Sequence, residues 1–493
     1  DILPNVVSKY SQYLAVRRRS SSLITVPLGG CFGIFQATDE YEGISRELVD
    51  GIENTDFVLL VSQFEFVNNK LVCPMDGTDG ETMAAATFCS LDQFDRPTLG
   101  FVNICLNKIK VEDDGTITQK TVDNFVGVLI REFAQALGLN SESFKYFRDV
   151  QTGEPLTQRP FQPQQVTCVD EKNIFPNIVL PSSKVIRAVE TSRGNGIYYE
   201  VVTSQVRQVV RNQFNCQEMT GAKLDTGSSC FGTHFEERFY YAESQSAIFA
   251  EEANYFSALT LAFFEDTGWY VPNYRAAKAS PFGHGVGCDF VKDCIVNGNV
   301  PDYSKGFFCN KIRDNVSTGV RKNDYMCNPS LTHKALCDLR RGFPPPTDFQ
   351  YFPEVGVGPS VVELEWCPVA LDEVMSCQDP NMEQDNPTIP GEEFGPESRC
   401  FETTADAHGP MCLRSFCNER ARTLDVTMNG NTLICDEDFK TLTFSLSQIF
   451  SGLLETTLYI SIECPRLAAA CPRYVHCVTF VSFEKTLYGT VCV

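Results

Sequence analysis

The sequence has no basic surface of the kind that nucleic acids require. Lys and Arg number 41 against 63 Asp and Glu, so the formal net charge is -22, and no Lys/Arg-rich run extends beyond Arg17-Arg18-Arg19. Proteins that bind phosphate backbones need a positively charged face. This charge balance excludes DNA and RNA as expected partners.

Long apolar runs are also missing. No segment approaches the roughly 18 consecutive apolar residues that a membrane helix needs, so we expect no direct membrane span. The chain begins at Asp1 instead of a methionine. We therefore expect a mature, processed and soluble extracellular protein, in which a removed signal peptide, propeptide or lipid-anchor signal would leave no trace.

Several catalytic motifs are absent as well. There is no G-x-S-x-G sequence, no glycine-rich phosphate loop and no C-x2-C pair of the kind found in structural zinc modules. The segment 225–228 reads Asp-Thr-Gly-Ser, as in aspartic proteases, but it occurs once, and that chemistry needs a pair of carboxylates. Only five histidines are present, at positions 234, 284, 333, 408 and 476.

Cysteine, in contrast, is abundant. There are 22 cysteines, which predicts up to eleven disulfides in a secreted or surface-exposed protein. Seven lie between Cys31 and Cys230, and fifteen between Cys288 and Cys492. Both counts are odd, so at least one bridge should join the two parts. The sequon at Asn315 fits the same compartment and predicts a glycoprotein.

The composition predicts an α+β fold in more than one domain. A chain of 493 residues is long enough for two to four domains. Residues 1–280 read as a conventional α+β body, whereas residues 281–493 read as a disulfide-rich, loop-rich and β-containing C-terminal domain. No internal repeat is evident.

Hydrophobic spacing predicts the main elements of the first part. Residues 56–61 and 99–104 are short apolar runs typical of buried strands. Residues 121–137 have apolar side chains at helical spacing, with Thr121 placed to cap the helix and Gly138 to end it. Residues 255–266 predict a second helix, apolar nearly all round. On this pattern alone, positions 131 and 135 lie opposite the apolar stripe of the first helix and should face solvent.

The end of the first helix resembles the zinc helix of leishmanolysin-like metallopeptidases. The family pattern H-E-x-x-H-A-L-G-F aligns without a gap: Arg131 and Gln135 occupy the histidine positions, while Glu132 and residues 136–138 match. Other collinear segments resemble the family in the same order, at residues 54–59, 86–89, 100–104, 232–238, 255–270 and 287–294. The resemblance covers about residues 2–480 and is strongest from 54 to 294.

This resemblance implies a metzincin-like body and three domains. The first, residues 1–140, contains the zinc-type helix, and the second, residues 141–280, contains the segment that matches the third zinc histidine, at His234. The Cys-rich domain covers residues 281–493. The family places a methionine beneath the metal, and Gln245 stands at that position, two residues after a matching Glu243.

The resemblance also implies that the catalytic site is degenerate. In the family, three imidazoles hold the zinc ion, and the glutamate acts as general base. Arg131 is a permanent cation that would repel a dication, and the Gln135 amide is a poor zinc ligand. We therefore expect no zinc and no functional catalytic residue among Arg131, Glu132, Gln135, His234 and Gln245. Without a metal-bound water to activate, Glu132 should form an ion pair, to Arg131, Arg148 or another cation.

Three hypotheses follow for the function. The first is a catalytically inactive pseudopeptidase, in a family whose members are typically cell-surface proteins of protists. It would serve as an extracellular or cell-surface structural, adhesion or interaction component with protein or glycoprotein partners. The second is a residual or active metalloendopeptidase with rebuilt ligands, or a metal-independent peptidase. The third is a decoy or regulator of an active homologue.

Overall fold

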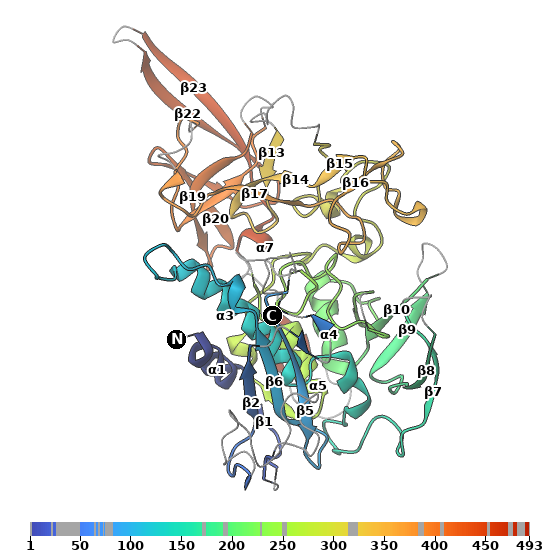
Figure 1. Ribbon diagram of the computed structural model, residues 1–493. Coiled ribbons are helices and arrows are strands. Elements are labelled where there is room, and N and C mark those ends of the chain that lie inside the picture. The colour runs from blue at the N-terminus through green and yellow to red at the C-terminus, as the bar shows by residue number, and fades with distance from the viewer. Residues whose placement is uncertain are drawn as a thin grey trace. The chain divides into compact units, whose positions relative to one another are not determined.

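The computed structural model describes most of the chain and divides it into two compact units (Figure 1). The first unit comprises residues 1–209, 220–236 and 242–278, and the second comprises residues 210–219, 237–241 and 279–493. The three-domain division at residues 140 and 280 stays a prediction. The described residues are 2–20, 23–25, 50–63, 66–67, 70–71, 73, 82–169, 174–190, 196–226, 229–248, 254–313, 324–382, 389–404, 409–450, 454–471, 477–480 and 489–492.

A three-stranded sheet forms the frame of the first unit. Its order is β2 (Val58–Ser62), β6 (Pro97–Ile104) and β5 (Ala84–Leu91), with β6 parallel to β2 and antiparallel to β5. All eight residues of β6 are buried, as expected for a central strand. The two strands expected at 56–61 and 99–104 are therefore confirmed, with ends displaced by two residues at most.

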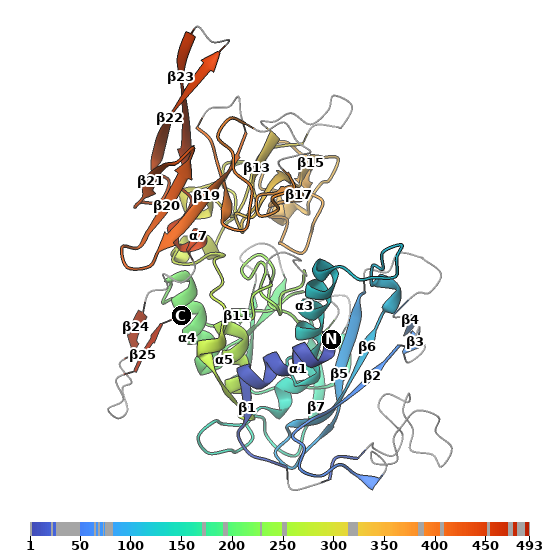
Figure 2. The ribbon, with the colours of Figure 1, turned by 90° about the vertical axis from the view of Figure 1, so that its left-hand side faces the viewer.

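Helix α3 (Gln119–Ala136) packs on β5 and β6, as Figure 2 shows. Its N-cap is Thr118, whose hydroxyl accepts the Thr121 N–H at 3.2 Å, so the predicted cap at Thr121 is wrong by one turn. The hydroxyl of Thr118 can reach this N–H because Thr118 has extended backbone. The predicted end is confirmed: Gly138 has φ of 110°, and a Cβ there would lie 2.8 Å from the Trp269 ring.

Two further helices pack in the first unit. Helix α5 (Ala258–Asp266) is buried almost all round, which confirms a core helix. Its predicted start at Tyr255 is wrong, because Tyr255 instead forms a β-bridge with Glu243 and Ser257 caps the helix. Helix α1 (Ile2–Tyr13) packs on α3, and the Tyr13 ring stacks on Phe256 with centroids 4.2 Å apart.

The remaining elements of the first unit are short. They are β1 (Leu14–Val16) paired with β12 (Tyr270–Pro272), β3 (Phe66–Val67) with β4 (Lys70–Leu71), β7 (Pro163–Thr167) with β8 (Ile174–Val179), the sheet β9 (Ile186–Glu190), β10 (Ile197–Val201) and β11 (Ala222–Lys223), and 3-10 turns at Leu106–Lys108, Ser141–Tyr146 and Tyr274–Ala276. Helix α4 (Ser204–Phe214) begins in the first unit and ends in the second.

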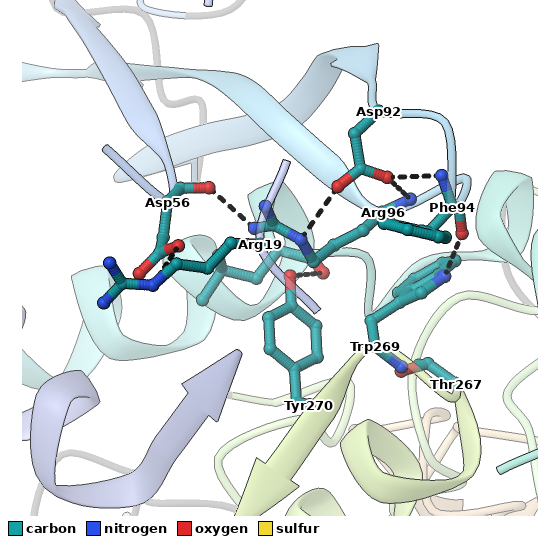
Figure 3. Close-up of polar contacts among 9 residues, drawn as sticks. Arg19, Asp56, Asp92, Phe94, Arg96, Thr267, Trp269 and Tyr270 are labelled. Atoms are coloured by element: carbon teal, nitrogen blue, oxygen red, sulfur yellow. Dashed lines mark hydrogen bonds and ion pairs between the residues drawn. The ribbon is translucent and has the colours of Figure 1, made fainter. Parts of the chain in front are cut away.

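A buried arginine lies in the turn between β5 and β6, and the segment that follows α5 contacts the same turn through Trp269 (Figure 3). The Arg96 side chain donates to the Asp56 carbonyl at 2.6 Å and pairs with the Asp92 carboxylate at 3.2 Å. The indole N–H of Trp269 donates to the Phe94 carbonyl at 3.1 Å. Arg96 and Asp92 side chains are 1% and 0% exposed, so this ion pair fixes the turn between β5 and β6 from the inside.

The second unit is built from small antiparallel sheets. They are β13 (Tyr325–Cys327), β14 (His333–Cys337) and β17 (Ala370–Ser376); β15 (Leu339–Arg341) with β16 (Val357–Pro359); β18 (Ser398–Phe401), β19 (Met411–Asn418), β20 (Thr423–Met428) and β21 (Asn431–Cys435); the long hairpin β22 (Thr441–Phe450) and β23 (Leu454–Glu463); and β24 (Cys477–Phe480) with β25 (Gly489–Cys492). The described part of this unit also contains helix α7 (Leu467–Ala470) and 3-10 turns at Cys288–Val291, Asp302–Ser304 and Thr347–Phe349. Alternating buried residues along β20 pack into its core.

Disulfides cross-link both units, as the cysteine content predicts. No cysteine of the described part is free. The bridge Cys216–Cys288 joins the segments before and after residue 280, so the expected link between the two cysteine groups is confirmed. The others in the described part are Cys73–Cys105, Cys168–Cys230, Cys294–Cys367, Cys309–Cys337, Cys327–Cys400, Cys377–Cys412, Cys417–Cys471 and Cys435–Cys464, and Cys89 is also bonded.

Candidate functional site

The candidate site lies in the first unit, where α3 meets the chain around His234. The guanidinium Nη2 of Arg131 lies 2.8 Å from Nε2 of His234 and donates to the Ala247 carbonyl at 3.2 Å. A guanidinium can only donate, so His234 Nε2 must be the acceptor. The imidazole proton is then on Nδ1, which faces the Asp225 carboxylate at 3.3 Å. Asp225, His234 and Arg131 thus form one continuous hydrogen-bonded chain.

Local backbone structure holds His234 and Asp225 together. One carboxylate oxygen of Asp225 accepts the backbone N–H groups of Thr233 at 2.7 Å and His234 at 3.1 Å. Gly232 has φ of 82°, and a Cβ at this position would collide with the Asp225 carbonyl. The close approach of Gly232 to Asp225 therefore requires a glycine at position 232.

The surroundings of His234, between Asp225 and Arg131, keep its imidazole neutral. Burial lowers its pKa, the hydrogen bond that His234 donates to Asp225 raises it, and the charge of Arg131 lowers it again, with a net lowering. Burial alone would raise the pKa of Asp225, but the hydrogen bonds that its carboxylate accepts from His234 and Thr233 bring it below its usual value. A neutral imidazole is the form that accepts a hydrogen bond from Arg131.

Two glutamines fill the space beside Arg131. Gln245 donates to the Arg131 carbonyl at 3.4 Å, and the amides of Gln135 and Gln245 lie 3.5 Å apart. Gln135 is only 6% exposed and Gln245 is fully buried, so the solvent-facing position predicted for Gln135 is wrong. Helical spacing of apolar residues cannot detect a polar side chain that is buried against another polar side chain.

Glu132 follows Arg131 but does not pair with either arginine expected from the sequence. Arg131 turns to His234, and Arg148 pairs with Asp95 at 2.6 Å, so these two expectations are wrong. The carboxyl of Glu132 accepts the backbone N–H of Ala86. Burial raises its pKa from 4.5 to about 7, although the charge of Arg131 and the Ala86 hydrogen bond lower it. Glu132 can therefore exchange a proton near neutral pH.

Sequence comparison identifies the family to which this chain belongs. The sequence model of the family described as Leishmanolysin matches residues 1–476. The chain belongs to the leishmanolysin family. The chain is 29% identical to a leishmanolysin-like peptidase of Caenorhabditis elegans over 387 residues, which are 72% of this chain and 56% of the relative. It is 30% identical to one of Drosophila melanogaster, over 62% of this chain and 43% of the relative.

Protist leishmanolysins align over more of the chain at lower identity. That of Leishmania major is 22% identical over 468 residues, which cover 92% of this chain and 65% of the relative. The chain spans about half the length of the first curated relatives it matches. The mixed α+β fold with many disulfides is that of a leishmanolysin-like protein, so the predicted family and fold class are confirmed.

Arg131, Gln135 and His234, the side chains that the sequence resemblance aligns with the zinc ligands, do not fit a zinc ion in this arrangement. His234 is the single imidazole among them, and its Nε2 already faces the Arg131 guanidinium. Across the described residues, no three His, Cys, Asp or Glu side chains are grouped closely enough to hold a metal ion. His284 and His333 belong to the second unit, where His284 contacts Gln213 and His333 contacts Thr332.

Glu243 is a buried residue that connects the segment around Gln245 to helix α5. Its carboxylate accepts the Thr260 hydroxyl at 2.6 Å and the Ser257 N–H at 3.3 Å, which ties residues 242–247 to the start of α5. Burial raises its pKa from 4.5 to about 7, against the hydrogen bonds from Ser257 and Thr260 that lower it.

The sequence gives no indication of one residue of the candidate site. Asp225 stands in an Asp-Thr-Gly-Ser segment that resembles an aspartic-protease motif, whereas in the structure it is the hydrogen-bond partner of His234. The nine-residue spacing of Asp225 and His234 gives no periodic signal that would reveal this contact.

His408, His476 and the sequon at Asn315 lie outside the described residues. No described helix is both long and apolar enough to cross a membrane.

Proposed function

We propose that this leishmanolysin-family chain is a catalytically inactive pseudopeptidase that works by binding. The observation that carries the proposal is the contact between Arg131 and His234, 2.8 Å apart. Zinc would need to lie about 2.1 Å from Nε2 of His234, in the direction that the guanidinium now occupies. A permanent cation stands where the family's chemistry requires a dication.

The surrounding contacts make this arrangement hard to reverse. To admit a metal ion, Arg131 would have to release both His234 and the Ala247 carbonyl. Gln135 and Gln245 would then offer only neutral amides. Glu132 retains the position of the family's general base but has no metal-bound water to activate. We therefore expect no zinc cofactor in the native protein.

The environment that we propose is the outside of the cell. Many disulfides fit an extracellular protein. We propose secretion or cell-surface attachment and a structural, adhesion or interaction role with protein or glycoprotein partners. The net charge of -22 favours partners with basic surfaces.

A residual peptidase is the second candidate, and one observation favours it. Glu132 has a pKa of about 7, which suits a general acid or base at neutral pH. The Asp225–His234 pair could orient such chemistry without a metal ion. A decoy that binds an active homologue would share the inactive site and would be recognised by copurification with that homologue.

Peptidase assays separate these functions. The native protein is incubated with a denatured protein substrate and a library of fluorogenic peptides. We expect no cleavage of either substrate, with or without phenanthroline. Cleavage that phenanthroline abolishes would refute the proposal in favour of a metallopeptidase. Cleavage that resists phenanthroline and is lost in Glu132→Gln, but retained in the matched exposed control Glu142→Gln, would establish the metal-independent peptidase.

A further inference from the structure

Arg131 is a fixed cation that forms no ion pair with any described residue. Its hydrogen bonds within the described part of the chain, to Nε2 of His234 and to the Ala247 carbonyl, both use Nη2. Neither acceptor carries a charge, and Nε of Arg131 is buried without a hydrogen-bond partner among the same residues. A guanidinium has five N–H donors, and its bonds to carboxylates are the strongest that it forms. Arg131 therefore keeps donors and a charge that its described surroundings leave unsatisfied.

Two carboxyl groups lie close by, but both are directed elsewhere. Asp225 lies on the other side of the His234 imidazole, with its carboxylate 3.3 Å from Nδ1, and it also accepts the backbone N–H of His234 at 3.1 Å. The carboxyl of Glu132 accepts the backbone N–H of Ala86. Neither carboxyl group therefore neutralises Arg131 by direct contact.

The site is open to solvent. The side chain of His234 is 25% exposed, and Arg131 is partly exposed as well. Because His234 and Ala247 hold the guanidinium in one orientation, an entering ligand meets donors that are already in place.

The charge of the site selects the class of ligand. One guanidinium matches one planar carboxylate, whose two oxygens accept from parallel N–H groups. Ligands with many negative charges are disfavoured, because the whole chain carries a net charge of -22. A single carboxylate on an otherwise uncharged or basic molecule fits both conditions.

We propose that the site around Arg131 binds a carboxylate of a peptide or protein partner. The carboxylate accepts from the N–H groups of Arg131 that His234 and Ala247 leave free. This inference rests on the proposed function, since a site that binds without cleaving can retain a peptide. The carboxylate comes either from a chain end or from an Asp or Glu side chain, and the experiment separates these sources.

Three pools of acetylated random octapeptides test the proposal on the native, disulfide-bonded protein, near neutral pH and at low salt. No pool contains Asp. The first ends in a free carboxylate, the second in a carboxamide, and the third in a carboxamide with a single internal Glu, the only Glu in the three pools. Peptides that stay with the protein during ultrafiltration are counted by mass spectrometry. We expect about tenfold more retention of the first or the third pool than of the second, and the pool retained identifies the source.

The same measurement separates this inference from the proposed function. Equal retention of all three pools, or retention of none with every peptide intact, would overturn the carboxylate assignment and leave the inactive pseudopeptidase standing. Shortened peptides in the mass spectra would refute the pseudopeptidase itself, and with it this inference.

Substitutions locate the ligand. Arg131→Gln removes the charge and should lower retention of the carboxylate pool about tenfold, whereas Arg131→Lys keeps the charge without the planar fork and should have an intermediate effect. Arg187→Gln is the matched control, since Arg187 is also a partly exposed arginine of the first unit but pairs with Glu200 at 3.3 Å. Retention that is unchanged in Arg131→Gln, or lost equally in Arg187→Gln, would place the ligand elsewhere. If Arg131→Gln fails to fold, Arg131→Lys and Arg187→Gln decide.

Discussion

Replacing Glu132 by glutamine should stabilise the first unit, and only above about pH 5. In the native protein, burial raises the pKa of Glu132 from 4.5 to about 7. Below pH 4.5 the carboxyl is protonated in both the folded and the unfolded chain, so burial carries no ionisation cost. Above pH 7 it is ionised in both, and the full cost applies. The contribution of Glu132 to stability thus falls as the pH rises from about 4.5 to about 7.

The size of the effect follows from the pKa. A rise from 4.5 to about 7 corresponds to about 3 kcal/mol. Because the side chain retains partial contact with solvent, we expect Glu132→Gln to raise the free energy of unfolding by about 1–3 kcal/mol at pH 8. At pH 4.5 the variant and the native protein should differ little. Glutamine can still accept the Ala86 N–H, so this contact is preserved.

The two tryptophans allow the first unit to be measured alone. Trp269 is buried in the first unit and Trp366 belongs to the second, where it stacks on Phe349. In a Trp366→Phe background, Trp269 fluorescence during urea unfolding of the oxidised protein reports the first unit. Glu142→Gln is the control, because Glu142 is exposed. A Glu132→Gln variant that is as stable as the native protein at pH 8, or less stable at both pH values, would refute the reasoning.

Three other changes have defined outcomes. Arg131→His with Gln135→His should create a zinc site together with His234, detected as about one bound zinc per chain; a folded variant that binds none would show that the three positions do not converge. Arg96→Met should lower the free energy of unfolding by about 3–5 kcal/mol in urea titrations, because Asp92 is left buried without its cation, and a loss below about 1 kcal/mol would contradict the buried ion pair. Mild reduction should unfold the second unit before the first, as read from the separate tryptophans; simultaneous loss of both signals would contradict this order.

The sequence predicts two helices of the first unit, α3 and α5, because their signals are local. The apolar spacing along α3 and the positive φ of Gly138 are local features, and both the helix and its end are as expected. The cap is displaced to Thr118, since several hydroxyl side chains near a helix start can accept the first free N–H groups.

The candidate site could be predicted only in part. The family resemblance gives its positions, but the contact between Arg131 and His234 joins residues 103 apart in the sequence. Nothing in the pattern of the helix indicates that Arg131 turns toward His234 and away from solvent. The burial of Gln135 against Gln245 is equally invisible, because two polar side chains that satisfy one another leave no hydrophobic signal. Disulfide pairing likewise depends on the folded chain.

The zinc content of the native protein tests the central claim most directly. The chain should be purified without chelators, equilibrated with a small excess of zinc, passed through gel filtration and measured by elemental analysis against protein concentration. We predict well under about one tenth of a zinc ion per chain, because Arg131 occupies the free side of His234. About one zinc ion per chain, lost on His234→Ala but retained on His333→Ala, would contradict the account.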